Sequence, residues 1–317
     1  MTGAGRAVAL CLSLGLTGTS LQAQEAAQAP ASPPPPAPYR IERFSLPGPV
    51  AGVLARVDLT DPRVSVEVAL TDDTDPDGDG PCTGQLDLTS AAAKRRDYAI
   101  TLNASFFAAP KQVDVLGHKV RYFVGNCTWP VGWHMARGKL VSKPGNDKMR
   151  AALIVHTDGR LSIDGDLAVL PKDARHVVSG NLQVLKDGEP VKSDDKAPRH
   201  PRSVVGLTQD RKTLILVAID GRQGTAEESP NGIPHSRGTT NQETGELMKR
   251  FGAHDAVNLD GGGSTAMVVK DPRTGAFSVA NRPSDQSTLK LPVLMERPVA
   301  DVIGIAIDWQ AAPPSKK

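Results

Sequence analysis

The sequence predicts an α+β fold in a single domain, with mixed β-sheets and a few helices. Many short segments are rich in β-branched residues and alternate apolar with polar side chains, whereas only two segments have helical spacing. No internal repeat with a period of about 20–50 residues is visible. This proportion of strands to helices is typical of an α+β domain.

The predicted strands are apolar runs bounded by turn-forming residues. They are Val50–Leu59, Val64–Leu70, Ala99–Leu102, Ala151–His156, Val204–Leu207, Leu214–Ile219, Ala256–Leu259, Ala266–Val269 and Val302–Ile307. The two predicted helices are Thr89–Arg96, which has an alanine-rich face, and Thr240–Phe251. Gly252 ends the second helix, because glycine commonly follows a helix C-terminus.

The first residues of the chain have the pattern of an export signal. Arg6 supplies a positive start, Ala7–Leu16 is a short apolar run, and small and polar residues follow up to Ala23. The apolar run is too short to span a bilayer. We therefore expect residues 1–23 to be a signal peptide, and the protein to be periplasmic or secreted without stable membrane insertion.

Composition places the other boundaries. Residues 24–38 are rich in Ala, Pro and Gln, which predicts an extended tether. Residues 39–94 form an N-terminal β-rich part of the domain, and residues 95–310 form its remainder. Together they amount to about 270 residues, enough for one sizeable core. Residues 311–317 are a polar tail.

Charge and cysteine content limit the partners and the compartment. Removal of residues 1–23 takes away Arg6 and no acid, so the formal net charge falls from +2 to +1. A nearly neutral chain argues against a nucleic acid or an anionic membrane as partner. Cys82 and Cys127 remain, and an exported setting permits a disulfide between them, although their spacing does not fix the geometry.

The segment Thr71–Gly80 is acidic, and Asp73-x-Asp75-x-Asp77-Gly begins like a calcium loop. An EF-hand needs Glu at residue 84, which is Gly here, and Pro76 interrupts the loop. A solvated acidic loop is the preferred interpretation, and calcium binding stays an open alternative. The histidines show no metal-ligand spacing, so we expect no metal and no cofactor.

The segment His254–Met267 is the most informative part of the chain. An apolar run ends at Asn258 and Asp260, and three glycines follow at once. Glycine lacks a Cβ, so the backbone can turn sharply and bring its N–H groups close to a ligand. By analogy with glycine-rich anion loops, we expect a site for an anionic or sugar-like ligand here instead of a plain turn.

Further polar groups follow or precede other predicted strands, where side chains can face a crevice. They are Asn103 with Ser105, Arg199 with His200 and Arg202, Asp220 to Arg222, and Asn281 to Asp285. Arginines suit phosphate or carboxylate, although each could equally form a structural salt bridge. Asp220, Glu243 and Asp260 are candidates for nucleophile, base or acid. A serine-hydrolase elbow at Ser264 is excluded because no His follows it in the chain.

These residues occur in an order that resembles the phosphodiester glycosidase family. The resemblance covers roughly residues 95–308 and rests on the following motifs. They are Asn103-Ala-Ser-Phe-Phe, Pro201-Arg-Ser, Asp220-Gly-Arg, Thr240 with Glu243, Asn258-Leu-Asp-Gly-Gly-Gly-Ser-Thr, Asn281-Arg-Pro-Ser-Asp and Glu296-Arg-Pro-Val. The family more often has Asn-Gly-Gly where this chain has Asn103-Ala-Ser, and Gln223–Arg237 looks like a variable loop.

The resemblance implies hydrolysis at a sugar anomeric carbon that is joined to a phosphodiester. Asp260 is then expected at the anomeric centre, with Glu243 or Asp220 as its partner, and the stereochemical outcome stays open. The expected substrate-binding and phosphate-binding residues are Asn103, Arg202, Arg222, Asn258, Gly261, Gly262, Gly263, Ser264, Thr265, Asn281, Arg282 and Asp285. The expected partner is a sugar phosphate or polysaccharide. Two alternatives are a non-catalytic binding protein for phosphorylated glycans and an exported phosphodiesterase that cuts the P–O bond.

Overall fold

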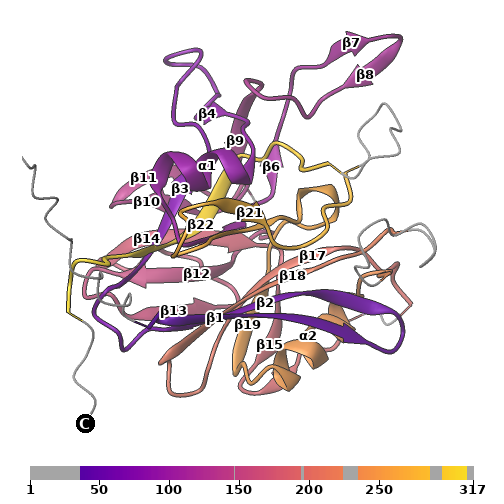
Figure 1. Cartoon of the computed structure of the whole chain (residues 1–317). Coiled ribbons are helices and arrows are strands. Elements are labelled where there is room, and N and C mark those ends of the chain that lie inside the picture. Colours follow the sequence, from indigo (N-terminus) through magenta and orange to yellow (C-terminus); the bar gives the residue numbers. More distant parts are fainter. Residues whose placement is uncertain (1–35, 146, 194–195, 224–234, 286–294, 313–317) are drawn as a thin grey trace, which may run out of the picture. The chain divides into compact units, whose positions relative to one another are not determined.

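A computed structural model describes residues 36–312, except residues 146, 194–195, 224–234 and 286–294 (Figure 1). The expected signal peptide, most of the expected tether, most of the Gln223–Arg237 loop and the end of the polar tail lie outside the described residues. Within them, no helix has the length and apolar character needed to cross a membrane.

Three larger sheets and two small ones account for the described strands. In spatial order, the first sheet contains β1 (Tyr39–Leu46), β2 (Val50–Asp58), β18 (Thr213–Ile219), β17 (Arg202–Leu207), β19 (Asp255–Asn258), β15 (Leu182–Lys186) and β16 (Glu189–Pro190). The second contains β11 (Lys139–Ser142), β10 (His134–Ala136), β14 (Ala174–Gly180), β12 (Ala151–His156) and β13 (Leu161–Asp164). The third contains β21 (Phe277–Val279), β20 (Met267–Lys270), β5 (Ile100–Asn103), β22 (Asp301–Ile307) and β3 (Val64–Leu70).

The remaining elements are short. The small sheets are β4 (Gly84–Gln85), β9 (Cys127–Pro130) and β6 (Phe107–Ala108), and the hairpin β7 (Val113–Val115) with β8 (His118–Val120). The helices are α1 (Thr89–Arg96), α2 (Asn241–Arg250) and the 3₁₀ turn η2 (Gly262–Ser264). All predicted strands and both predicted helices are present, with small differences at their ends.

The described domain is mainly β, and its two α-helices satisfy the predicted α+β class only in a coarse sense. The prediction of mixed sheets was wrong, because every described strand pair is antiparallel. A parallel pair needs a long crossover connection, usually a helix, and this chain connects most of its strands by turns and loops.

The main hydrophobic core is shared by the three larger sheets. It contains side chains such as Leu216 from the first sheet, Leu153 from the second and Ile303 from the third. The opposite face of the first sheet packs against α2 (Figure 1). Leu247 and Met248 of α2 belong to the same buried cluster as side chains of that sheet. Thr240 and Glu243 cap α2 reciprocally, and this capping box fixes where the helix begins.

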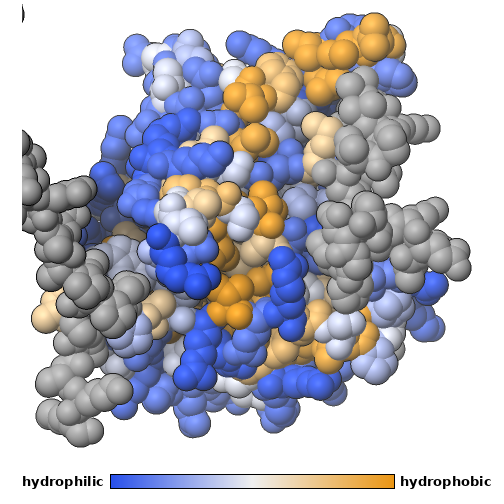
Figure 2. Space-filling model, in the orientation of Figure 1, coloured by the Kyte–Doolittle hydropathy of each residue, from blue (hydrophilic) through white to orange (hydrophobic). Residues whose placement is uncertain are grey.

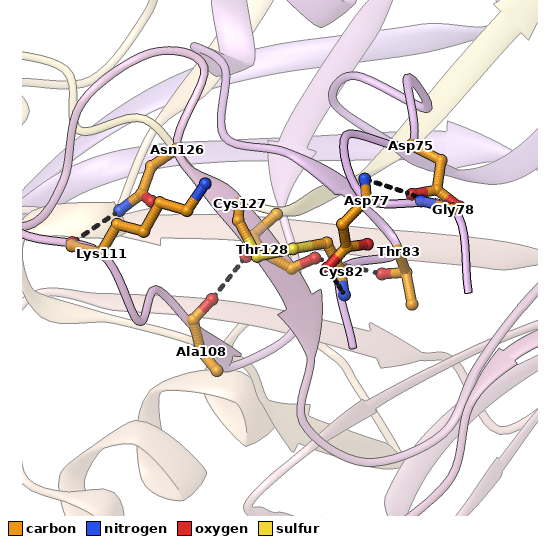
Figure 3. Close-up of a disulfide and its surroundings, with 10 residues drawn as sticks. All are labelled: Asp75, Asp77, Gly78, Cys82, Thr83, Ala108, Lys111, Asn126, Cys127 and Thr128. Atoms are coloured by element: carbon orange, nitrogen blue, oxygen red, sulfur yellow. Dashed lines mark hydrogen bonds between the residues drawn. A yellow bond between two sulfur atoms is a disulfide. The ribbon is translucent and has the colours of Figure 1, made fainter. Parts of the chain in front are cut away.

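The predicted disulfide between Cys82 and Cys127 is confirmed, with the two Cα atoms 5.5 Å apart (Figure 3). It ties the end of the acidic segment to β9. Next to it, Thr128 donates to the backbone oxygen of Ala108, so β6, β9 and the acidic segment form one local unit.

The β7–β8 hairpin carries exposed apolar side chains, and Figure 2 shows an apolar area there. Leu116 is 90% exposed, and Val113 and Val115 are also exposed. The same chain segment returns through Tyr122, which lies against Arg297 and so connects this hairpin to the site described below.

Candidate active site

The polar segments that the sequence singled out meet at one end of the first and third sheets. Arg202 at the start of β17 lies opposite Ile219 at the end of β18. Asn258 ends β19, and its pairing with β17 brings it to the same end. In the third sheet, the N–H of Asn103 at the end of β5 donates to the oxygen of Ala266 (3.2 Å). The segment between Asn258 and Ala266 therefore passes from one sheet to the other.

Asn103 anchors this connecting segment, which we call the glycine loop (Asp260–Thr265). Its Nδ2 donates to the backbone oxygen of Asp260 (2.7 Å), and its Oδ1 accepts from Ser203 and Ala266. Asn103 is 1% exposed. Both ends of the side-chain amide therefore hold the loop. These hydrogen bonds explain why Asn is present at this position without any contact to a sugar.

The backbone of the glycine loop differs from the expected row of free amide donors. The N–H groups of Gly262, Ser264 and Thr265 donate to Pro201, Gly261 and Gly262 oxygens, respectively. These three amides are engaged because the loop closes into the tight turn η2 and packs against Pro201. They are therefore not available to a ligand in this conformation.

The glycines instead leave room for arginine side chains. A Cβ on Gly262 would lie 3.2 Å from the guanidinium nitrogens of Arg222, and a Cβ on Gly263 would lie 2.4 Å from Arg297 Nη2. Gly262 also has φ +63°, which favours glycine. Two guanidinium groups consequently lie directly against the loop that carries Asp260.

Arg222 is held in an unusual conformation beside a second basic group. Its φ is +56°, a left-handed conformation that a long side chain rarely adopts. Its Nη2 lies 3.1 Å from His200 Nδ1. Because a guanidinium can only donate, His200 accepts through Nδ1 and carries its proton on Nε2. Burial, Arg222 and Arg202 all lower the pKa of His200, so its imidazole is neutral.

Positive charge at this end of the fold is only partly compensated. Burial and the charge of Arg222 lower the pKa of Arg202, whose Nε donates only to the oxygen of Thr239. Among the described residues, neither Arg202 nor Arg222 forms an ion pair with a carboxylate. Arg202 is partly buried and Arg222 is exposed, and guanidinium groups without such partners are the kind of group that binds phosphate or carboxylate ligands.

Arg297 was not among the predicted site residues, although the Glu296-Arg-Pro-Val motif contained it. It pairs with Asp285 (3.0 Å) and lies 4.2 Å from the ring centroid of Tyr122. The preceding Glu296 accepts from the N–H of Ser90 in the first turn of α1 (2.7 Å). Asp285, predicted to contact substrate, thus holds Arg297 in place together with the aromatic ring.

Asp260 is near enough to Arg297, Arg222 and the acid Asp301 for their charges to act on its carboxyl group. Burial raises the pKa of its carboxyl to about 7, although the residue keeps some solvent exposure. Ser264, Arg297 and the Gly261 N–H act in the opposite direction, while the negative charge of Asp301 raises the pKa further. Ser264 Oγ has no well-aligned hydrogen-bond partner among the described groups. A carboxyl poised near neutral pH in such a place is a candidate acid or base.

Asp220 is buried on the other side of the loop. Its Oδ1 accepts from the N–H of Arg282 (2.8 Å) and from Nδ2 of Asn281 (3.1 Å). Burial raises its pKa to about 6, and the nearby Arg282 guanidinium opposes this shift. Asn281 also donates to the oxygen of Thr265 and accepts from Met267. These contacts give Asp220 and Asn281 a role in supporting the glycine loop.

The other predicted site residues are buried or form hydrogen bonds within the protein. Asn258 is fully buried and donates to Asn181 (2.8 Å). The hydroxyl groups of Ser264 and Thr265 are buried without partners among the described residues. Glu243 accepts from Arg199 and from the N–H of Thr240, so the helix cap accounts for its carboxylate.

Two groups among the described residues have the spacing of metal ligands, and both lie away from the glycine loop. Cys82 and Cys127 belong to one of them, but their sulfurs are joined in the disulfide. The other contains Asp255, whose carboxylate is already paired with Arg211 (2.6 Å).

Comparison with known proteins gives the family of the chain and its fold. The family model of the phosphodiester glycosidases matches residues 97–306. The chain is similar in structure to the catalytic domain of zebrafish N-acetylglucosamine-1-phosphodiester alpha-N-acetylglucosaminidase, auto-inhibited by its pro-peptide. The TM-score is 0.59 at 22% identity, over 88% of this chain and 85% of that chain. No curated protein sequence gives a significant match.

Two bacterial structures share the fold at lower identity. A hypothetical protein from Synechocystis has a TM-score of 0.52 at 14% identity, over 85% of this chain and 62% of that chain. A putative exported protein from Burkholderia pseudomallei K96243 has a TM-score of 0.54 at 16% identity, over 81% of this chain and 74% of that chain. At these identities the structural likeness concerns the fold.

Proposed function

The chain belongs to the phosphodiester glycosidase family, and on this premise we propose that it hydrolyses a sugar-1-phosphodiester to a free sugar and a phosphomonoester. The proposed substrate class is a glycan or envelope polysaccharide that carries such a diester. One observation carries the proposal: the guanidinium groups of Arg222 and Arg297 lie against the glycine loop beside the carboxyl of Asp260.

The leaving group explains why arginines matter more than a strong acid. A departing phosphomonoester is a weak base, so it needs charge stabilisation more than protonation. Arg222 and Arg297 supply that charge, and Arg202 adds a third cation close to Arg222. Their positions are fixed before substrate arrives by Asp285, Tyr122 and His200. Preorganised cations of this kind lower a barrier without reorganisation during the reaction.

Asp260 then acts at the anomeric carbon in its ionised form, either as the base that activates water or as the nucleophile. We propose Asp220 and Glu243 as supporting residues, because their carboxylates are engaged by the 281–282 backbone segment and by the α2 cap. With the pKa of Asp260 near 7, kcat/KM should rise with pH through neutrality.

We also propose that the protein works outside the cytoplasm. The signal-like residues 1–23 and the disulfide between Cys82 and Cys127 support this location, because disulfides persist in oxidising compartments. Fractionation of cells that produce the full chain tests it. Recovery of a shortened, disulfide-bonded protein outside the cytoplasm is the expected result, and an uncleaved cytoplasmic protein is the contrary one.

The decisive experiment supplies a panel of sugar-1-phosphodiesters in ¹⁸O-labelled water. Cleavage at the anomeric carbon puts the label into the released sugar, whereas cleavage at phosphorus puts it into the phosphate. Label in the sugar supports the proposal. Label in the phosphate favours the exported phosphodiesterase, and saturable binding without any product favours a non-catalytic glycan-binding protein.

A further inference from the structure

The chain segment from Val113 to Val124 exposes apolar side chains next to the candidate active site. Leu116 and Val124 keep 90% and 58% of their surface exposed, and Val113 and Val115 are exposed as well. The β7–β8 hairpin projects from the described domain in Figure 1, and Figure 2 shows the apolar area on it. Single exposed apolar residues are common, but several in one short segment indicate a surface that contacts another molecule.

The β7–β8 hairpin has one apolar face. Val113 lies directly opposite Val120, and Val115 is two positions further along β7, so these three side chains point to the same side. Asp114 and Lys119 occupy the other side and form an ion pair (3.2 Å). Among the described strands, β7 and β8 pair only with each other, and none of the three valines belongs to a buried apolar cluster. The apolar face therefore contributes little to the core of the domain.

Tyr122 joins this apolar segment to the arginines of the site. The guanidinium carbon of Arg297 lies over the Tyr122 ring, 4.2 Å from its centroid. Phe107 meets the same ring edge-on, with the two centroids 5.8 Å apart. Arg297 also lies against Gly263 of the glycine loop, and Val124 is two residues beyond Tyr122. A group attached to a phosphate at Arg297 would therefore meet the aromatic ring first and the exposed apolar side chains next.

We propose that Tyr122, Val124 and the apolar face of the β7–β8 hairpin form a subsite for a hydrocarbon chain esterified to the phosphate of the substrate. The place of the phosphate rests on the proposed function, and the subsite adds the class of the aglycone, which is an alkyl or other lipid chain. A phosphodiester has two ester oxygens. The sugar is attached to one of them, beside Asp260, and the chain extends from the other along the hairpin.

Two observations favour a hydrocarbon chain over a polar aglycone or a second copy of the protein. The exposed valine and leucine side chains offer no hydrogen bonds to a sugar polymer. They also follow directly on Tyr122, and so on the cation that would hold the phosphate. Residues 111–121 contain three cations and one acid. Two copies that met at this hairpin would bring like charges together, which opposes their association.

The test measures the binding of methyl, butyl and octyl phosphate to the purified protein by calorimetry. Full burial of a methylene group improves binding by roughly fourfold, and an open surface covers only part of the chain, so octyl phosphate should bind about tenfold or more tightly than methyl phosphate. Replacing Val113 and Val124 together by Ser should remove most of this gain and leave methyl phosphate binding unchanged. Leu140→Ser is the matched control, because Leu140 is an exposed leucine on β11 in another sheet.

Leu116→Asn provides a second variant at the end of the hairpin. Residue 116 has φ +52°, a left-handed conformation that Asn tolerates better than Leu, so this change should not impair folding. It should weaken the binding of dodecyl phosphate, whose chain reaches further along the hairpin, more than the binding of butyl phosphate. Equal effects on both ligands would contradict the proposed path of the chain.

Equal affinity of the wild type for methyl and octyl phosphate, or no binding of either, overturns the proposal. A gain that persists in the double valine variant does so too. A dimer that this variant dissociates, without any gain from the octyl chain, assigns the face to a second copy instead. Failure of the proposed function is distinguishable: a valine-dependent preference for octyl phosphate in a protein that cleaves no diester supports the subsite and counts against hydrolysis. Equal kcat/KM for methyl and octyl sugar-1-phosphodiesters overturns the subsite and leaves hydrolysis standing.

Discussion

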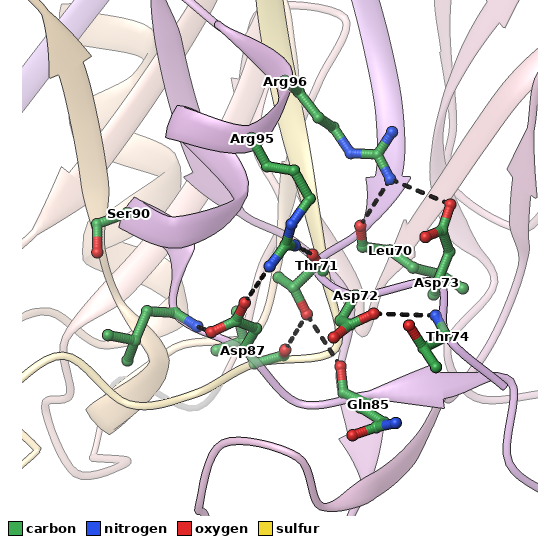
Figure 4. A network of polar contacts seen from close by, with 12 residues as sticks. Leu70, Thr71, Asp72, Asp73, Thr74, Gln85, Asp87, Ser90, Arg95 and Arg96 are labelled. Carbon is green, nitrogen blue, oxygen red and sulfur yellow. Dashed lines mark hydrogen bonds and ion pairs between the residues drawn. The ribbon is translucent and has the colours of Figure 1, made fainter. Parts of the chain in front are cut away.

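The glycine-loop site and the acidic region are both rich in charged residues, but they differ in how far those charges are paired. The acidic region comprises Thr71–Gly80 together with Asp87, Arg95 and Arg96 at and near α1. In the acidic region, Arg95 pairs with Asp87 (2.5 Å) and Arg96 pairs with Asp73 (3.6 Å), as Figure 4 shows. Asp72 there accepts from the N–H of Thr74 (2.9 Å). Each of these three acids has a local donor, and these contacts hold loops and a helix together.

The glycine-loop site leaves part of its charge without an ion-pair partner among the described residues, although Arg297 pairs with Asp285. Arg222 has a neutral imidazole as its neighbour, and Asp260 is buried enough that its pKa reaches about 7. Unpaired or buried charges of this kind lower the stability of the fold, and they are more common at functional sites than in purely structural regions. The contrast indicates that substitutions in the acidic region should affect stability, whereas substitutions at the site should affect activity.

The largest expected effect is at Asp260. Asp260→Asn keeps the size of the side chain and removes its charge, so kcat/KM for a sugar-1-phosphodiester should fall by about a thousandfold or more. The melting temperature at neutral pH should not fall and should rise somewhat, because burial raises the pKa of this carboxyl to about 7, and its ionisation then costs stability that Asn does not. Steady-state kinetics and calorimetry measure the two effects. Undiminished turnover in this variant would remove Asp260 from the mechanism.

The next effect concerns the uncompensated arginine. Asn tolerates the left-handed backbone of residue 222, so Arg222→Asn removes the guanidinium without added strain. We expect kcat/KM to fall by about a hundredfold to a thousandfold with unchanged folding stability. Arg96→Ala in the acidic region is the matched control and should retain full activity. Equal losses in both variants would contradict the contrast between the two regions.

The disulfide should show the reverse pattern. Replacing Cys82 and Cys127 by Ser opens a cross-link between residues separated by 45 positions. The free energy of unfolding should drop by on the order of 3–4 kcal/mol, while activity at 25 °C persists. Urea unfolding and diester hydrolysis under the same conditions test both parts. Lost activity at unchanged stability would show that this region takes part in the reaction.

A smaller effect is expected at Asp220, and it depends on pH. Its pKa is about 6 in the folded chain and lower when unfolded, so the stability linked to its proton is complete below about pH 4 and is lost as pH rises through 6. Asp220→Asn retains an oxygen for Asn281 and Arg282, and should stabilise the protein at pH 8 but not at pH 4. Urea titrations at both pH values measure this. Destabilisation at pH 8 would mean that the ionised carboxylate is required for folding.

The long buried strands could be predicted from the sequence, whereas the short exposed ones could not. Val64–Leu70 and Ala151–His156 have the predicted bounds because continuous β-branched runs specify strands locally. β7 and β8 have only three residues each, which is too short for a recognisable alternation, and the two-residue β4 is defined by its pairing with the distant β9. The antiparallel arrangement of the sheets could not be predicted from composition either, because the relative direction of two strands depends on how they are connected.

The sequence singled out residues that the fold brings together at the candidate site, but it did not give the direction of each side chain. It identified Asp260, Arg222 and the glycines, since these types stand out at strand ends. Asn103 was expected to face substrate and instead turns inward to hold the loop. The buried hydrogen bond between His134 and Asp301 could not be predicted, because the two residues lie 167 positions apart in the chain and only folding brings them together.

The smallest expected effect is that of calcium on the acidic region. Asp75 Oδ1 accepts from the N–H groups of Asp77 (3.1 Å) and Gly78 (2.9 Å), and Asp73 faces Arg96 (Figure 3, Figure 4). A calcium ion would have to replace these contacts and overcome the nearby guanidinium, and it needs six or more oxygen ligands. We therefore expect neither millimolar calcium nor a chelator to change the melting temperature measurably. A calcium-dependent rise that Asp75→Asn abolishes would show that the region binds the ion, and that its charges are less completely satisfied than those contacts imply.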